Sequence, residues 1–250
     1  MVPEFRTTLR EGQRDKMGKH MKKLLVAAVL VGVIFLDGDA GAKERVVSSI
    51  KIKDIDFKDA RVLDILQSIA RKHKVVIGLS GIATNPHVIN DTVDISIHQG
   101  TLKDVLDALA KARPEYTWEQ GEDGVVRVQV GTALPLAVLP IKAVDIENET
   151  RDSVAREIFR NTSEIKSWLQ EQNCMLLQNT GSIGGIETRY VVDPKTFTFH
   201  FNNERLDSIL STVAREEKTF FWYVIHNKST TGACGLYVQI ESSILTRHSH

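Results

Sequence analysis

One spacing of apolar residues occurs three times in this 250-residue chain and limits what each stretch around it can fold into. An apolar residue is followed, after four spacer residues, by an aliphatic residue and, three positions later, by an apolar–Leu pair. The occurrences are Phe57 with Val62, Ile65 and Leu66; Ile97 with Leu102, Val105 and Leu106; and Phe201 with Leu206, Ile209 and Leu210. Because the last inward residue of a strand and the first turn of the next helix must meet in one core, this spacing predicts a repeated strand–turn–helix unit.

The first half of the chain predicts one small module with the element order βαββαββ. Apolar and polar residues alternate over residues 46–57, and a slip between Ile52 and Ile55 predicts a bulge or a break in this strand. The other expected elements are a helix over 62–74, strands over 75–79 and 93–97, a helix over 102–110 capped by Thr101, and a closing hairpin over 116–130.

The second half predicts a diverged copy of this module with an insertion after its first helix. The expected elements are a strand over 138–146, a helix over 154–159, a helical turn over 165–169, a loop over 173–185, strands over 190–192 and 197–201, a helix over 204–216, and strands over 220–225 and 236–240. The fold class that follows is α+β, with two small mixed α/β modules in tandem.

The first module resembles the short N-terminal domain that secretins and TonB-dependent receptors share. The resemblance covers residues 48–130 and is carried by Ile55-Asp56-Phe57 and by residues 62–66, 93–97 and 102–109. It implies a protein of the bacterial envelope that engages partner proteins in secretion, pilus assembly or transmembrane signalling. Since no long β-rich secretin core or series of outer-membrane strands follows, we expect the chain not to be a pore or receptor itself.

An export signal is predicted near the N-terminus. Lysines at 19, 22 and 23 precede an apolar run over residues 24–36, and Ala40 and Ala42 supply the small residues of a cleavage site before Lys43. These thirteen apolar residues span about 20 Å as a helix, less than the roughly 30 Å of a bilayer core. We therefore expect a periplasmic protein, or alternatively a secreted one, without a stable membrane anchor after cleavage. A retained anchor is the alternative, because Asp37 and Asp39 make an acidic approach to the site.

The expected organisation has five parts. They are residues 1–42 as signal peptide and N-terminal extension, with Met17 or Met21 as an alternative start, 43–132 as the first module, 133–137 as a linker, 138–242 as the second module, and 243–250 as a tail. Prolines at 135 and 140 predict a stiff connection between the modules.

The mature chain carries one pair of cysteines, Cys174 and Cys234. Disulfides persist in oxidising compartments, so the pair forms either a bridge or two buried thiols. A metal site would need two more ligands, and no paired spacing supplies them.

No catalytic or cofactor motif is complete in the sequence. The GxxG stretch at residues 78–81 follows an apolar strand rather than joining two helices, and Ser182 lacks the first glycine of a nucleophile elbow. His87, His98, His200 and His226 are scattered without ligand spacing. The formal net charge of zero also gives no reason to expect a nucleic-acid partner. We therefore expect no enzyme, cofactor or metal.

Two surfaces are candidates for holding a partner. The strand over residues 125–130 is the expected sheet edge, with Val125, Arg127 and Gln129 on its outward side. Phe221, Trp222 and Tyr223 follow one another on a strand and therefore point to both faces, which suits either burial or a partner surface.

These observations leave three classes of function open. The first is an envelope assembly or adaptor module whose partner is another envelope protein, such as a secretion or pilus component, or a second copy of itself. The second is a peptidoglycan or glycan binder that uses Trp222 and the loop over residues 181–185. The third is an unrecognised hydrolase whose site is assembled from residues distant in sequence.

The exported protein is predicted to begin at Lys43, because Ala40 and Ala42 end the export-like segment. Intact-mass measurement of the exported protein tests this. A product in the membrane fraction that keeps residues 24–36 would contradict cleavage and establish an anchored protein.

Overall fold

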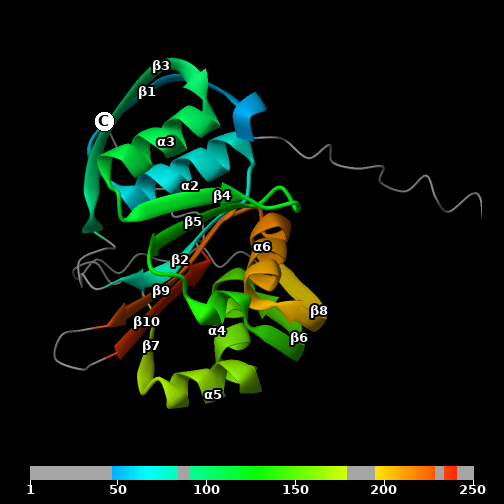
Figure 1. The fold of residues 1–250 in the computed structure, drawn as a ribbon. Helices are drawn as coiled ribbons and strands as arrows, with labels where there is room; N and C mark the ends of the chain where they lie inside the picture. Colours follow the sequence, from blue (N-terminus) through cyan, green and yellow to red (C-terminus); the bar gives the residue numbers. More distant parts are fainter. Residues whose placement is uncertain (1–46, 84–89, 179–194, 229–233, 241–250) are drawn as a thin grey trace, which may run out of the picture. The chain divides into compact units, whose positions relative to one another are not determined.

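A computed structural model describes residues 47–83, 90–178, 195–228 and 234–240, all within one compact unit that begins at Arg45. The fold is α+β, with five α-helices and ten strands among these residues (Figure 1). In chain order the elements are η2 (Val47–Ser49), β1 (Lys51–Arg61), α2 (Val62–His73), β2 (Ile77–Ala83), β3 (Thr92–Thr101), α3 (Leu102–Ala112), β4 (Tyr116–Gln120), β5 (Val126–Gly131), η4 (Pro135–Val138), β6 (Pro140–Thr150), α4 (Arg151–Asn161), α5 (Ser163–Glu171), β7 (Cys174–Gln178), β8 (Thr196–Arg205), α6 (Leu206–Glu216), β9 (Phe221–Lys228) and β10 (Cys234–Ile240).

The repeated spacing marks three junctions at which a strand passes directly into a helix. Helices α2, α3 and α6 begin at Val62, Leu102 and Leu206, each one residue after the preceding strand ends. Thr101 forms the predicted cap, since its hydroxyl accepts from the N–H of Asp104 while the Asp104 carboxylate accepts from the N–H of Thr101. The three predicted helices are therefore confirmed.

Two long antiparallel ribbons, β1–β3 and β6–β8, have the same kind of irregularity. The register shifts between Phe57 and Ala60 in β1, and between Ile146 and Glu149 in β6. At each shift a residue takes a left-handed conformation, Asp59 with φ 45° and Asn148 with φ 54°. The backbone N–H of each donates to a side chain of the partner strand. Both ribbons thus contain a β-bulge. At the slip that the sequence predicted in the first, Asp54 takes a left-handed conformation with φ 48° and is skipped by the ladder, but the register shifts only between Phe57 and Ala60.

A six-stranded sheet in the order β4-β5-β2-β9-β10-β7 joins the two halves of the chain. Strands β2, β5 and β9 are parallel to one another, and β4, β10 and β7 run in the opposite direction. The first three strands come from the first half and the last three from the second. The pairing of β2 with β9 is therefore the junction between the halves.

The helices of each half cover a different face of this sheet. Helices α2 and α3 pack with Ile77 and Val128 in one core, and α4 and α6 pack with Leu236 and Val238 in the other (Figure 1). Neither core belongs to one half alone. Phe221 of the second half is buried in the first core, while Val76 and Val125 of the first half are buried in the second.

The connection between the halves is part of the second core. Leu134, Leu136 and Ala137, around η4, are all buried. The predicted linker over residues 133–137 is thus packed rather than free, and the tandem arrangement of two modules stays a prediction, since both halves contribute to one sheet.

The predicted loop over residues 173–185 is wrong at its start. Residues Cys174–Gln178 form β7, which pairs in parallel with β10. The partner strand lies far along the chain, and a short strand without alternation of its own gives no local sign of such pairing. The rest of that loop, the strand over 190–192, His87, Ser182 and the export segment lie outside the described residues.

The junction is tightly packed where Gly78 of β2 lies beside Trp222 of β9. A Cβ atom at Gly78 would overlap the Trp222 ring. That ring is 1% exposed, and its Nε1–H donates to Ser211 Oγ at 3.0 Å, so it has no room to move.

Gly78→Ala is predicted to lower the free energy of unfolding by about 1–3 kcal/mol, because the added methyl group overpacks the junction. Gly235→Ala is the matched control, since its Cβ would meet only the tip of the flexible Leu177 side chain. Urea titration measures both, and equal losses in the two variants would contradict a rigid junction.

Candidate functional site

The strand proposed as the sheet edge is an interior strand. β5 pairs with β4 on one side and with β2 on the other, so the edge assignment for residues 125–130 is wrong. Val125 is fully buried, and Gln129 is half-buried with its amide donating to Gly131 O. The sequence could not place this strand because its second neighbour, β2, lies far earlier in the chain, and alternation within residues 125–130 does not specify that pairing. A proline at Arg127 would now interrupt a ladder between two neighbours rather than trim an edge.

Arg127 also belongs to an ion-pair cluster that links the two halves of the chain. Its guanidinium donates to Asp123 at 2.9 and 2.6 Å and to Asp207 of α6 at 3.0 Å. Arg205 also donates to Asp207, whose side chain is 3% exposed. The bonds to Asp123, chiefly, raise the pKa of Arg127, so this side chain stays charged at every accessible pH. Removing one partner of a buried ion pair lowers the stability of the fold, because the other charge stays buried without compensation. The cluster therefore has a structural role.

The three consecutive aromatic residues on β9 do not form a partner surface. Phe221, Trp222 and Tyr223 are 1%, 1% and 4% exposed. They alternate between the two faces as predicted, but helices cover both faces, so Phe221 and Tyr223 enter the first core and Trp222 the second. The glycan-binding alternative therefore loses the exposed tryptophan on which it depended.

The described strands leave the six-stranded sheet with β4 at one end and β7 at the other. At the two ends of the β4–β5 ladder, the N–H of Gly131 donates to Glu115 O and the N–H of Gly121 donates to Val125 O. Because such pairs alternate along an antiparallel ladder, the N–H and C=O of Trp118 point away from β5, toward the outer side. The edge at β4 therefore presents backbone groups in the orientation that an added strand needs.

The opposite edge carries an exposed apolar side chain. Met175 of β7 is 67% exposed, the largest exposure among the large hydrophobic residues that the structure describes. The ribbon strands also have outer sides, but their bulges interrupt the row of backbone groups, which makes them poorer templates. The two ends of the central sheet are thus the candidate site, and we call them the β4 edge and the β7 edge.

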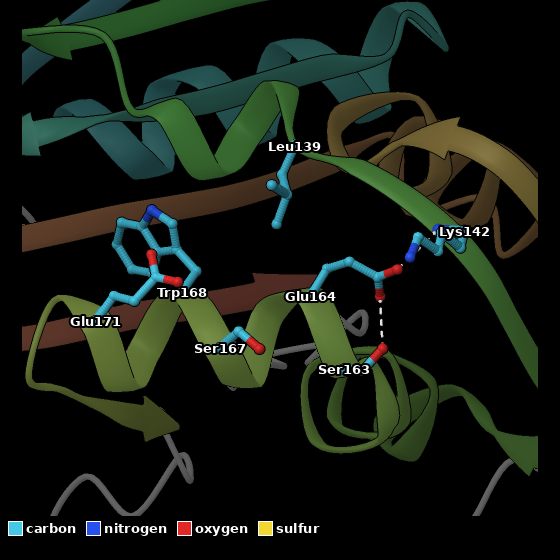
Figure 2. Close-up of a pocket in the computed structure, with 7 residues that line it drawn as sticks. All are labelled: Leu139, Lys142, Ser163, Glu164, Ser167, Trp168 and Glu171. Atoms are coloured by element: carbon cyan, nitrogen blue, oxygen red, sulfur yellow. Dashed lines mark hydrogen bonds between the residues drawn. The ribbon is translucent and has the colours of Figure 1, made fainter.

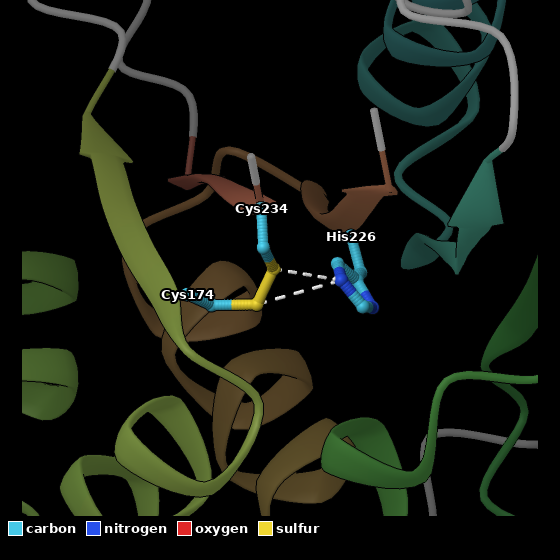
Figure 3. Close-up of side chains that lie close together, drawn as sticks. All are labelled: Cys174, His226 and Cys234. Carbon is cyan, nitrogen blue, oxygen red and sulfur yellow. Dashed lines mark hydrogen bonds between the residues drawn. A yellow bond between two sulfur atoms is a disulfide. The ribbon is translucent and has the colours of Figure 1, made fainter. Parts of the chain in front are cut away.

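A disulfide between Cys174 and Cys234 holds β7 to the sheet (Figure 3). The two residues are directly opposite in the parallel register, with Cα atoms 4.5 Å apart. The imidazole of His226, on β9, is 5% exposed, and its Nε2 atom lies 2.8 Å from Cys234 Sγ and 3.4 Å from Cys174 Sγ. The bridge therefore fixes the β7 edge in place, and a buried histidine packs against it.

The same three side chains form a group of potential metal ligands within the described residues. Their ligand atoms lie within 4.8 Å of one another. Metal-binding cysteines are thiolates, however, and both sulfur atoms are here joined to each other. In the oxidised protein this group is therefore a covalent cross-link between two strands rather than a metal centre. Sequence reasoning missed His226, eight residues before Cys234, because its position beside the bridge depends on the β9–β10 register.

A surface pocket of about 340 Å³ lies beside α5 (Figure 2). It is lined by Leu139, Lys142, Ser163, Glu164, Ser167, Trp168 and Glu171. The pKa of Glu164 is lowered chiefly by a hydrogen bond from its own backbone N–H. Hydrogen bonds from the Ser163 hydroxyl and the Lys142 N–H lower it further. An ionised carboxylate that only accepts hydrogen bonds cannot serve as a general acid at neutral pH.

The scattered histidines remain separate where the structure describes them. His98 is exposed on β3, and His200 pairs with Asp145 at 2.9 Å on the exposed side of the β6–β8 ribbon. An exposed pair of this kind contributes little to stability.

A search against models of known protein families found no match, and no curated protein matched the chain either. The helices within the described residues are all too short or too polar to cross a membrane. The disulfide is compatible with an exported protein. The resemblance to the secretin and TonB-receptor domain stays a prediction.

Replacing both cysteines, Cys174→Ala with Cys234→Ala, is predicted to lower the free energy of unfolding by about 2–4 kcal/mol, because the bridge closes a long loop in the unfolded chain. Urea titration of the double variant, beside the native protein with and without a dithiol reductant, measures it. Identical urea midpoints in all samples would show that the disulfide does not stabilise the fold.

Proposed function

We propose that this chain is a non-enzymatic assembly module of the bacterial envelope, exported to the periplasm, that binds other proteins by strand addition at the ends of its central sheet. The observation that carries the proposal is the pair of outer strands, β4 and β7, one with backbone groups pointing outward and the other with an exposed methionine. An extended segment of a partner gains main-chain hydrogen bonds at such an edge and specificity from alternating side-chain contacts.

The repeated registers support a doubled module as the framework. Each half contributes one bulged ribbon and three strands of the central sheet, and in each half the strand order is the same. Two copies of one small module, each resembling the short N-terminal domain of secretins and TonB-dependent receptors, would account for this. The partner in that reading is a component of a secretion, pilus or signalling system.

The disulfide supports the location and the mode of binding. Cys174 and Cys234 join an outer strand to its neighbour, which preorganises the β7 edge before a partner arrives. Preorganisation lowers the ordering cost of binding. For a hydrolase function, the Cys–His group offers no thiolate, because its two cysteines are oxidised.

Site-specific photo-crosslinking in cells that export the protein tests this function. A photoreactive residue at Met175 on the β7 edge or at Thr117 on the β4 edge is expected to give crosslinked protein adducts, because both side chains are exposed beside an outer strand. The same residue at exposed Lys111 on α3 is the matched control. Adducts at the control position alone, or at none of the three, would contradict assembly through the sheet edges.

A further inference from the structure

The junction inside the chain shows how this sheet accepts another three-stranded unit. The first half supplies its strands in the order β4-β5-β2, and the second supplies the counterparts β9-β10-β7 in the same order. Each counterpart runs in the opposite direction to its equivalent, and its helices cover the opposite face. A half-turn about an axis that crosses the strands, combined with a shift by three strands, therefore carries the first half onto the second.

Applying the same operation once more places a new first half beyond β7. The strand that then lies beside β7 is β4 of another copy, and the two run in parallel as β2 and β9 do. We infer that the partner at the β7 edge is the β4 edge of a second copy of this chain, an inference that rests on the proposed strand addition. The contact joins two different surfaces, so it leaves an open edge at each end and can propagate.

Met175 occupies a position that the inner junction buries. Counted from the open end of each hairpin, the first pair of the β4–β5 ladder, Tyr116–Val130, corresponds to the first pair of the β9–β10 ladder, Trp222–Ile240. Since β2 pairs with β5 and β7 pairs with the equivalent strand β10, the correspondence extends to β2 and β7. In it, Met175 is the equivalent of Val76. Val76 is 5% exposed because elements of the second half cover it, whereas Met175 is 67% exposed. The next copy would cover Met175 in the way that the second half covers Val76.

The outer contact lacks the two features that lock the inner one. In the outer contact, Leu177 and the next copy's Tyr116 take the positions of Gly78 and Trp222. Tyr237 and the next copy's Lys103 likewise take the positions of Arg127 and Asp207, which form an ion pair inside the chain. The outer contact therefore depends on backbone hydrogen bonds and on Met175. It is weaker than the inner junction and forms as the concentration of the protein rises.

Sedimentation velocity of the purified exported chain, with its disulfide oxidised, tests this inference over a wide concentration series. The weight-average sedimentation coefficient should rise steadily and pass the value of a dimer, because each added copy leaves a new edge. Met175→Lys should weaken the association by about tenfold or more, since it removes buried apolar area and adds a charge to the contact. His98→Lys is the matched control, because it adds the same side chain at an exposed position of β3, which is not a strand of the central sheet.

Three results would overturn the inference: a monomer at every concentration, an association that stops at a dimer, or one that Met175→Lys and His98→Lys weaken equally. Met175 is mostly exposed, so its replacement leaves the fold intact, and equal urea midpoints of the two variants verify this. Edge crosslinks to a different protein together with a monomer in solution would retain the proposed function and reject the second copy as partner.

Discussion

The rest of the structure depends on the parallel pairing of β2 with β9. This pairing joins two three-stranded units into one sheet, and it lets each half bury side chains in the core of the other. An isolated two-stranded hairpin is at best marginally stable in water, and the first half alone would leave Val76 and Val125, which the second half buries, uncovered. The Arg127–Asp207 ion pair and the Gly78–Trp222 fit reinforce the same contact. The two halves are therefore expected to unfold in one cooperative transition.

The same junction explains where function is placed. The inner strands are paired on both sides and covered on both faces, so aromatic and charged residues there serve the fold. Among the described residues, the β4 and β7 ends of the sheet have an unpaired side, Met175 adds exposed apolar surface at the β7 end, and a disulfide secures that end. Chemistry that would need a thiolate meets an oxidised cysteine pair instead.

Local features of the fold could be predicted from the sequence, and non-local ones could not. Strand–helix junctions at Val62, Leu102 and Leu206 follow from spacing, because a core contact across one turn fixes the distance in the chain. A fourth junction, from β6 into α4, was harder to see since Arg151 occupies the position of the aliphatic residue. Pairings such as β2–β9 and β7–β10 join segments far apart, and no periodicity within either segment specifies its neighbour.

That limit accounts for the errors in the candidate site. Alternation placed the side chains of residues 125–130 on the correct faces, but which strand is outermost depends on what pairs next to it. Aromatic content likewise identified β9 as unusual without showing that helices cover both of its faces. The cysteines could be named as a pair from their compartment, whereas His226 beside them depended on the β9–β10 register.

Native-state amide hydrogen exchange measures the central claim most directly. The N–H of Ile77 donates to Phe220 O at 2.9 Å across the junction between the halves. If one sheet makes the halves a single cooperative unit, this amide exchanges only through global unfolding. Its free energy of exchange should then equal those of the buried helical amides of Leu66 in the first half and Leu210 in the second. Rapid exchange at Ile77, with different free energies for Leu66 and Leu210, would show two independent modules and contradict the account.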